Sequence, residues 1–253
     1  MQKRRISHTN IEVSLLGLGT VKFGRNQGVK YPAEFELPSD KAIANLLGVA
    51  SDLGITLLDT APAYGSSEER LGKALLGKRQ EWIVATKAGE EFIDGVSKYD
   101  FSAGAIRQSV ERSLKRLRTD YLDIVLVHSN GDDLAIIEND DVFVTLSALK
   151  QEGKLRAYGM STKTVQGGRQ AIDRADIAMV TYNPSYTDER EVIQYAEQKQ
   201  KGIFIKKAFG SGHLSPEAAL TFILAEPGVT SIILGTINPD HLRENVKMAC
   251  AGR

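Results

Sequence analysis

Four side chains with complementary acid–base chemistry follow three apolar runs of this sequence: Asp59 and Tyr64 in DTAPAYG, Lys87 in ATKAG, and His128 in LVHSNG. A tyrosine is a poor acid at neutral pH because its pKa is about 10, and a nearby ammonium lowers that pKa. We expect Asp59 to pair with Lys87 and hold it charged, so that Lys87 lowers the pKa of Tyr64. Tyr64 would then donate a proton to a developing alkoxide, while His128 would bind and orient the substrate oxygen. The set indicates carbonyl reduction, with hydride supplied by a cofactor.

Each of these residues also has a structural interpretation when it is taken alone. An aspartate after a strand often caps the next helix, a tyrosine is often buried, and a strand-end lysine normally reaches solvent. A single histidine is more often a core or rim residue than a catalyst. Four such residues together are harder to explain by structure alone. A second chemistry stays open, in which Lys87 forms a Schiff base as in an aldolase-type lyase.

The sequence lacks the patterns of two other classes of site. Its four histidines (His8, His128, His213 and His241) are far apart, and no HxH, HExxH or CxxC occurs. We therefore expect no metal site. No GxSxG turn occurs either, which disfavours a serine hydrolase.

The elements that must position these residues alternate along the chain. Several apolar runs lack polar alternation, as is typical of parallel strands covered on both faces. The strands are predicted at residues 14–19, 55–59, 82–87, 122–128, 155–160, 177–182, 202–206 and 231–234. Amphipathic segments between them predict helices at residues 40–53, 66–77, 103–117, 142–151, 164–175, 187–199, 215–226 and 238–248. Ser39, Ser66, Ser102 and Asn238 are candidate helix caps.

Eight strands that alternate with eight helices predict a parallel α/β sheet. About 32 residues per strand–helix unit favours closure into a single (β/α)8 TIM barrel over an open doubly wound sheet. We expect one domain over residues 1–253, with residues 3–13 forming an N-terminal β-hairpin that plugs one end. Because the carboxyl ends of barrel strands share one rim, the four reactive side chains are predicted to meet there.

Bulk composition narrows the possible functions. The 253 residues include 32 basic and 32 acidic side chains, so no net field draws the chain to nucleic acid or to an anionic membrane. We find no apolar run long enough to span a bilayer and no secretory signal after the basic first ten residues. The single cysteine, Cys250, fits a reducing compartment. We therefore expect a cytoplasmic monomer that acts on a small-molecule carbonyl substrate.

At DTAPAYG, ATKAG and LVH the sequence resembles the aldo-keto reductase superfamily. The resemblance spans about residues 10–248, in the order EVSLLGLGTVKFG at 12–24, LLDTAPAYGSSEERLGKAL at 57–75, IVATKAG at 83–89, YLDIVLVH at 121–128 and VTSIILGTINPDHLRENV at 229–246. It implies a barrel without a Rossmann domain that binds a nicotinamide cofactor across its C-terminal rim. It also implies Asp59, Tyr64, Lys87 and His128 as the catalytic residues, and aldehydes, ketones or sugars as substrates.

The resemblance further implies a set of cofactor-binding positions on the rim. They are Gly19, Thr20, Asp59, Ser161, Thr162, Lys206, Ser211, Gly212, Gly235, Thr236, His241 and Asn245. Three positions depart from the family pattern: Thr162 replaces an asparagine, Met179 a carboxamide-binding glutamine, and Lys206 an aromatic ring that stacks on the nicotinamide. The turn at residues 210–212 could direct its backbone N–H groups at the cofactor pyrophosphate.

The basic clamp on an adenosine 2′-phosphate is weak in this sequence. Ile237 and His241 stand where many members carry arginine or glutamine, and neither can form the bidentate bonds of a guanidinium. The resemblance implies NADP as the cofactor, and NAD is the alternative. Phe23 and Phe209 are candidate apolar walls of the substrate pocket. We expect that pocket to be open, because the acidic loop after His128 lacks an aromatic and little chain follows the last helix.

One alternative comes from outside the enzymes. Some barrels of this superfamily serve ion channels, so the chain could be a cofactor-binding regulatory or sensor barrel with little turnover. The complete set of four reactive residues favours an enzyme.

Overall fold

Eight parallel strands close into a barrel in the computed structural model, which describes residues 1–139 and 141–251. The barrel strands, in chain order, are β3 (Leu16–Gly19), β4 (Leu57–Asp59), β5 (Ile83–Ala88), β8 (Leu122–His128), β9 (Leu155–Ser161), β10 (Ile177–Thr181), β11 (Gly202–Lys206) and β12 (Ser231–Leu234). Each pairs in parallel with the next, and β12 closes the ring on β3. The predicted TIM barrel is confirmed, and every predicted strand is present.

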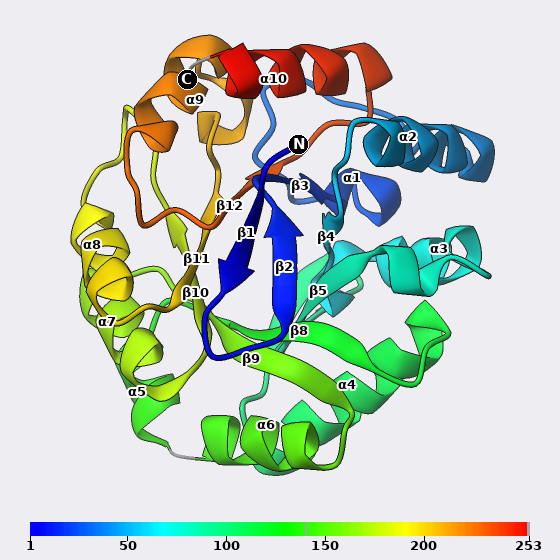
Figure 1. Ribbon diagram of the computed structural model, residues 1–253. Coiled ribbons are helices and arrows are strands. Elements are labelled where there is room, and N and C mark those ends of the chain that lie inside the picture. Colours follow the sequence, from blue (N-terminus) through cyan, green and yellow to red (C-terminus); the bar gives the residue numbers. More distant parts are fainter. Residues whose placement is uncertain (140, 252–253) are drawn as a thin grey trace.

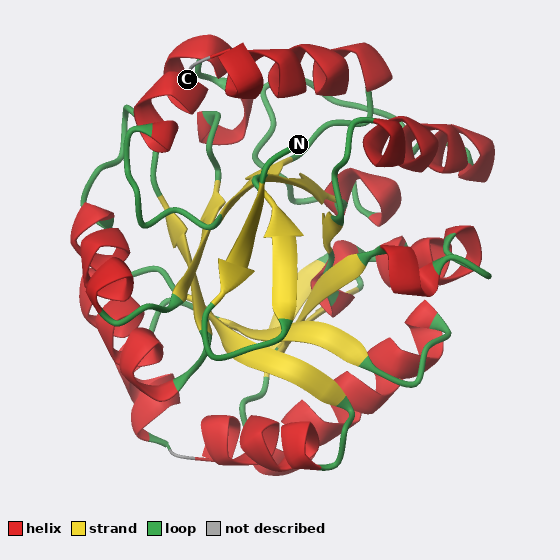
Figure 2. Ribbon diagram, in the orientation of Figure 1, coloured by secondary structure: helices red, strands yellow, loops and turns green. Residues whose placement is uncertain are grey.

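Helices surround the barrel on the outside (Figures 1 and 2). The longer ones are α2 (Asp40–Asp52), α3 (Ser67–Ala74), α4 (Ala103–Leu117), α6 (Asp141–Gln151), α7 (Val165–Arg174), α8 (Arg190–Gln198), α9 (Pro216–Leu224) and α10 (Pro239–Ala251). Shorter pieces are α1 (Val21–Gly24), α5 (Asp133–Glu138) and the 3₁₀ turns η1 (Pro62–Tyr64), η2 (Arg79–Glu81) and η3 (Gly210–Gly212). All eight predicted helices occur in this arrangement.

Local hydrogen bonds explain where several helices begin. Ser39 and Ser102 cap α2 and α4 as expected, because their hydroxyls accept bonds from backbone N–H groups three residues on. Ser66 occupies the predicted N-cap position of α3, but its side chain makes no capping hydrogen bond. Helix α8 begins three residues later than predicted, because residues 187–190 form a turn in which Arg190 N donates to the carbonyl oxygen of Thr187.

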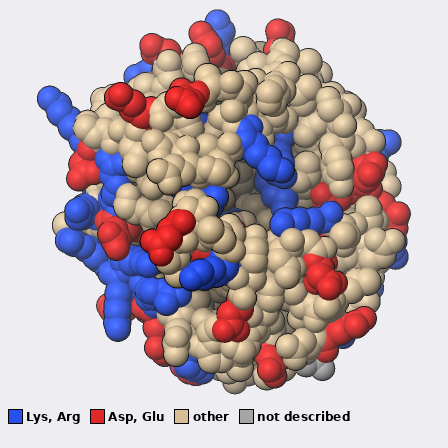
Figure 3. Space-filling view, turned by 180° about the vertical axis from the view of Figure 1, so that it is seen from behind, with Lys and Arg blue, Asp and Glu red and all other residues tan. Residues whose placement is uncertain are grey.

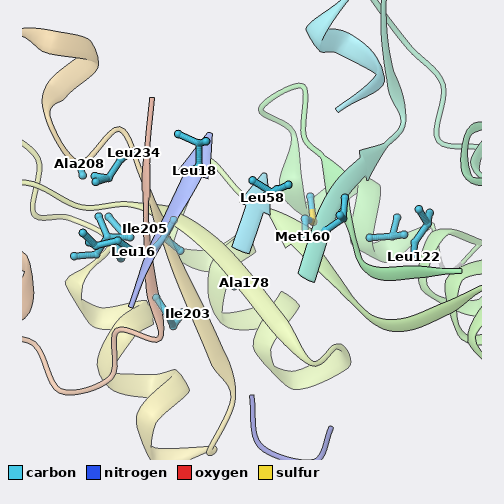
Figure 4. Packing of buried hydrophobic residues seen from close by; sticks show 14 of the residues in the cluster. Leu16, Leu18, Leu58, Leu122, Met160, Ala178, Ile203, Ile205, Ala208 and Leu234 are labelled. Atoms are coloured by element: carbon cyan, nitrogen blue, oxygen red, sulfur yellow. The ribbon is translucent and has the colours of Figure 1, made fainter. Parts of the chain in front are cut away.

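The hydrophobic core has two layers, inside and outside the ring of strands. Successive side chains of a strand point to opposite faces, so one strand serves both layers. On β8, Ile124 and Leu126 fill the barrel interior, while Val125 and Val127 pack against the outer helices. Figure 4 shows strand and strand-end residues of the outer layer, including Leu16, Leu18 and Ile205.

A hairpin of β1 (Lys3–Ile6) and β2 (Ile11–Ser14) lies across one open end of the barrel (Figure 1). Its strands are antiparallel, with Ile6 opposite Ile11. Ile6, Ile11 and Val13 are buried against the interior cluster, and burial of each such side chain stabilises the fold by about 1.5–3 kcal/mol. The predicted plug at the N-terminal end is confirmed.

A second hairpin, β6 (Glu90–Ile93) and β7 (Val96–Tyr99), lies between β5 and α4 and was not predicted. Gly89 makes the sharp turn into it at φ +96°, where a Cβ would lie 2.6 Å from a ring carbon of Phe101. Asp94 and Gly95 form its tip with positive φ angles. This Asp-Gly pair is a hairpin signal that was available in the sequence.

Candidate active site

A cavity of about 710 Å³ opens at the end of the barrel opposite the β1–β2 hairpin. Asp59, Tyr64, Lys87 and His128 all line it, from β4, η1, β5 and β8. Its volume lies in the usual range of small-molecule sites. Figure 3 shows this face of the molecule, with basic side chains gathered around a central hollow. The four reactive residues are therefore brought together, as the alternation of strands and helices predicts.

Asp59 and Lys87 form a buried ion pair between neighbouring strands. Lys87 Nζ lies 2.7 Å from Asp59 Oδ1 and donates a second bond of 2.9 Å to the carbonyl oxygen of Thr60. The Lys87 side chain is only 2% exposed, so both bonds form in a medium that screens charge weakly. The pair holds the ammonium in one position at the inner end of the cavity.

Tyr64 lies over this ion pair on the short turn η1. Its hydroxyl lies 3.5 Å from Asp59 Oδ2, and Lys87 Nζ lies 4.7 Å from the centre of its ring. Burial and the charge of Asp59 raise the pKa of Tyr64 well above 10. The expected lowering of the Tyr64 pKa is therefore wrong in its net sign, because burial of the phenol and the charge of Asp59 raise it. The phenol keeps its proton, which is the form a proton donor needs.

His128 faces Tyr64 across the cavity, and Glu90 holds it from behind. The Tyr64 and His128 rings are 6.3 Å apart and nearly perpendicular. His128 Nδ1 lies 2.6 Å from Glu90 Oε2, and Glu90 is 7% exposed. Burial lowers the pKa of His128, and Glu90 opposes this shift. Sequence reasoning missed Glu90, which stands three residues after Lys87.

Lys206 at the end of β11 enters the cavity beside these groups. Its ammonium donates to Ser161 Oγ at 2.9 Å and to the carbonyl oxygen of Thr162 at 2.6 Å. Burial lowers its pKa to about 8, although the charge of Glu189 opposes the shift. Burial likewise raises the pKa of Glu189 to about 7, opposed by Lys206. The charges of these two buried groups therefore influence each other, although Lys206 bonds to Ser161 and Thr162.

Most of the predicted cofactor positions line the same cavity. They are Gly19, Asp59, Ser161, Lys206, Ser211, Gly212, Gly235, Thr236, His241 and Asn245. Thr20 and Thr162 do not line it. Thr20 is fully buried, and its hydroxyl donates to the carbonyl oxygen of Asp59 at 2.9 Å, so it supports the chain that carries that carboxylate.

Two of the three backbone N–H groups in the turn at residues 210–212 are already bonded within the protein. The N–H of Gly210 donates to the carbonyl oxygen of Lys207, and the N–H of Gly212 donates to that of Phe209. These two donors are satisfied within their own turn and are not directed at a ligand. Positive charge in this part of the cavity comes from the side chain of Lys207 instead.

The loop after α1 forms a wall of the cavity that the sequence did not predict. It contributes Tyr31 and Phe35, whose rings are 5.5 Å apart, and Lys22 Nζ lies 4.0 Å from the centre of the Tyr31 ring. Burial and the charge of Asp59 raise the pKa of Tyr31 to about 12. The proposed apolar wall at Phe209 lines the cavity, whereas Phe23 is fully buried and packs in the outer core layer.

The rim next to Tyr31 has room for an extended ligand. Gly235, at the end of β12, faces the cavity, and a Cβ there would come within 2.9 Å of the Tyr31 hydroxyl. From this point the cavity continues along the start of α10, past His241 and Asn245. Lys206 and Lys207 provide two ammonium groups on its other side. The shape and charge fit a phosphate-bearing cofactor that runs across the rim.

Over residues 1–139 and 141–251, no group of three or more histidine, cysteine or acidic side chains is placed to hold a metal ion. In the same part of the chain, no helix has the length and apolar character needed to cross a bilayer.

Comparisons with known proteins agree with this geometry. The sequence model of the aldo/keto reductase family matches residues 15–218. The uncharacterized oxidoreductase YqkF of Bacillus subtilis is 29% identical, over 100% of this chain and 92% of that protein. Aldo-keto reductase YhdN of the same organism is 35% identical, over 79% of this chain and 60% of YhdN.

Solved structures give the same result for the fold. The crystal structure of PA4992 from Pseudomonas aeruginosa, a candidate aldo-keto reductase, is 52% identical with a TM-score of 0.92, covering 99% of this chain and 94% of that chain. The holo form of aldo-keto reductase AKR11C1 from Bacillus halodurans is 25% identical with a TM-score of 0.84, covering 98% and 90%.

Proposed function

The chain belongs to the aldo/keto reductase family, and from this premise we propose that it reduces small aldehydes or ketones with Tyr64 as proton donor and NADPH as cofactor. The observation that carries the proposal is the convergence of Asp59, Tyr64, Lys87 and His128 on one end of a single cavity. Nicotinamide-dependent carbonyl reduction is the activity of the family. The roles of these four residues are our assignment.

The four side chains act together on the oxygen atom of the substrate carbonyl. A bound nicotinamide cofactor supplies the hydride. The raised pKa of Tyr64 keeps the phenol protonated, so that it can give its proton to the oxygen as negative charge develops there. Lys87 neutralises Asp59 and keeps a positive charge 4.7 Å from the Tyr64 ring, which stabilises the phenolate that the transfer leaves. His128 holds the oxygen from the other side.

The contacts of Lys87 disfavour the Schiff-base alternative. A lysine attacks a carbonyl as the neutral amine, which usually requires desolvation without a partner or a neighbouring cation. Lys87 instead bonds to the Asp59 carboxylate and to the carbonyl oxygen of Thr60. These two acceptors stabilise the ammonium, which is not a nucleophile.

The residues along the cavity bear on the choice between NADPH and NADH. We propose NADPH on the family pattern, with Ser161 and Lys206 toward the nicotinamide and with Thr236, His241 and Asn245 toward the adenosine. NADH is the second candidate because Glu244, and no lysine or arginine, lines the cavity over residues 233–248. A carboxylate there repels a 2′-phosphate and can accept a hydrogen bond from a 2′-hydroxyl. One relative, from Escherichia coli, is named an NADH-specific methylglyoxal reductase.

The substrate part of the cavity favours compact carbonyl compounds with an apolar or aromatic side. Tyr31 and Phe35 supply flat walls near Tyr64, and the cavity is open toward solvent on this face (Figure 3). We propose that the protein acts as a monomer with a single barrel domain. Size-exclusion chromatography with light scattering tests the oligomeric state.

The proposal is tested by oxidation of NADPH and NADH, followed at 340 nm with 4-nitrobenzaldehyde as substrate. We expect turnover with at least one cofactor and its loss in Tyr64→Phe. Titration of each cofactor by fluorescence gives the two affinities separately from activity. Tight binding without turnover on any carbonyl compound would instead support the regulatory barrel. Trapping of a carbonyl compound on Lys87 by borohydride, without a nicotinamide, would support the lyase.

A further inference from the structure

Glu90 is the acidic side chain in contact with His128, and it reaches the imidazole from outside the barrel. It is the first residue of β6, directly after the Gly89 turn, so that β5 presents Lys87 to the cavity and β6 presents Glu90 to the histidine. Oε2 lies 2.6 Å from His128 Nδ1, and the Tyr99 hydroxyl donates to Oε1 at 3.2 Å. Both carboxylate oxygens therefore have partners, which fixes the side chain.

This contact determines which ring nitrogen carries a proton. Burial raises the pKa of Glu90, but hydrogen bonding and the charge of His128 lower it to about 2, so the group is a carboxylate at neutral pH. A carboxylate only accepts hydrogen bonds. Nδ1 is buried 2.6 Å from this carboxylate without an aligned hydrogen bond in the present ring orientation. Because two lone pairs would repel at this distance, we assign the ring proton to Nδ1, which leaves Nε2 for the cavity.

We propose that Glu90 is a positioning residue for the carbonyl-binding histidine: it orients the ring through Nδ1 and stabilises the imidazolium, the form whose Nε2–H can bind a carbonyl oxygen. This inference rests on the proposed function, because it concerns how His128 meets the substrate. A neutral ring held by Glu90 presents a bare Nε2, which accepts a hydrogen bond from an alcohol but repels a carbonyl oxygen. Glu90 thus favours the carbonyl-binding form over the alcohol-binding form.

The other groups around His128 act in the opposite direction or are already compensated. Burial lowers the pKa of His128, and Lys87 from β5 and Lys206 from β11 lower it further. Asp59 is paired with Lys87, and Tyr64 stays neutral. Glu90 is the group that opposes these shifts. Its removal should lower the pKa of His128 by about one unit or more, as expected for the loss of an opposite charge in contact.

The pH dependence follows from this sign. Reduction requires the imidazolium, so kcat/KM is highest below the pKa of His128 and falls about tenfold per pH unit above it. A lower pKa in Glu90→Gln moves this fall to more acidic pH. We expect the variant to lose about tenfold in kcat/KM at pH 7.5 and to regain most of it only below its own, lowered His128 pKa.

The experiment compares wild type with two variants. Glu90→Gln removes the charge and keeps a hydrogen-bond acceptor for Tyr99. Glu90→Asp keeps the charge but moves it away from His128, because its side chain is shorter. Glu91→Gln is the matched control, because Glu91 lies on the same strand and pairs with Arg112 and Arg116 instead. The His128 signal is followed by NMR of the full ¹⁵N-histidine-labelled chain, assigned by its absence in His128→Asn. The pH profile of kcat/KM is measured in parallel.

The expected result is a lower His128 pKa in Glu90→Gln, a smaller shift in Glu90→Asp, and none in Glu91→Gln. An unchanged titration of His128 in Glu90→Gln would overturn the proposal, as would an activity loss that is the same at every pH. Absence of carbonyl reduction in the wild type would overturn the proposed function. The NMR titration needs no turnover, so the two failures are distinguishable.

Discussion

The two ends of the barrel each bury an aspartate against cations, and they differ in what else the carboxylate faces. At the N-terminal end, Asp123 is 1% exposed and pairs with Arg79 at 2.7 Å and Arg156 at 2.5 Å, while Val84 N donates to it at 3.0 Å. Its two oxygens are occupied by the protein itself. Arg156 also donates to the carbonyl oxygen of Asn10, which ties the cluster to the plug hairpin.

At the C-terminal end, the buried Asp59–Lys87 pair lines an open cavity beside Tyr64. The Tyr64 hydroxyl makes only a long 3.5 Å contact to Asp59. The charge at this end acts on a group that a ligand can reach. The comparison teaches that burial and pairing alone do not identify a catalytic carboxylate. What distinguishes Asp59 is a titratable neighbour that faces open space.

The largest expected effect is a loss of activity at the C-terminal end of the barrel without a loss of stability. Tyr64→Phe removes the proton donor and should lower kcat/KM by about 10²–10⁴-fold. It should change the free energy of unfolding by less than about 1 kcal/mol, because the hydroxyl makes one long contact. Tyr31→Phe makes the same chemical change on the other wall of the cavity and should retain most activity. Equal losses in the two variants, or none in Tyr64→Phe, would remove Tyr64 as the donor.

At the N-terminal end of the barrel, a substitution should lower stability and leave activity unchanged. Asp123→Ala leaves Arg79 and Arg156 without their shared carboxylate, and breaking a buried pair costs about 3–5 kcal/mol. Urea unfolding measures this loss, while kcat of the folded enzyme at 25 °C should stay within about twofold. Glu111→Ala removes an exposed carboxylate that also pairs with cations, and it should leave both quantities unchanged. A stable Asp123→Ala with low kcat would contradict the division of roles.

The catalytic rim could be predicted from the sequence because parallel strands in a barrel bring their carboxyl ends to one side. Asp59, Lys87 and His128 each stand at or next to a strand end, and closing the ring brings these ends together. The burial of Asp123 was equally visible as a charge inside the apolar run LDIVLVH, but its partners come from distant segments. Pairing across the base of the barrel depends on side-chain reach, which spacing does not reveal.

Two other features depend on distances that the sequence does not contain. The sign of the pKa shift of Tyr64 is set by its burial and by its separation from Asp59, and nearest-neighbour reasoning gave the wrong direction. Tyr31 lies in a loop without hydrophobic periodicity, so nothing in its surroundings predicted that it would face the cavity. The position of Glu90 was easier to predict from the sequence, because the Asp94-Gly95 turn indicates the hairpin that carries it.

Within the rim, Lys206 should influence the cofactor through charge. Its ammonium disfavours the cationic oxidised nicotinamide relative to the neutral reduced form, and unit charges several ångströms apart at an effective dielectric near 20 repel by about 1–4 kcal/mol. We expect Lys206→Met to bind the oxidised cofactor about tenfold more tightly relative to the reduced one. Wild type should approach this ratio above pH 8, because the pKa of Lys206 is about 8 and its charge is lost there. An affinity ratio independent of pH and of the substitution would exclude this role.

The smallest expected effect concerns the far end of the rim, where an exposed charge should act weakly. Glu244 lines the cavity on α10, and Glu244→Lys replaces repulsion of a 2′-phosphate with attraction. Because exposed pairs are worth little, we expect the preference for NADPH over NADH to rise only about two- to fivefold. Glu217→Lys makes the same charge change on α9, where the residue is exposed but outside the cavity lining. An equal rise in both variants would show a general charge effect, whereas a rise confined to Glu244→Lys places the adenosine end beside α10.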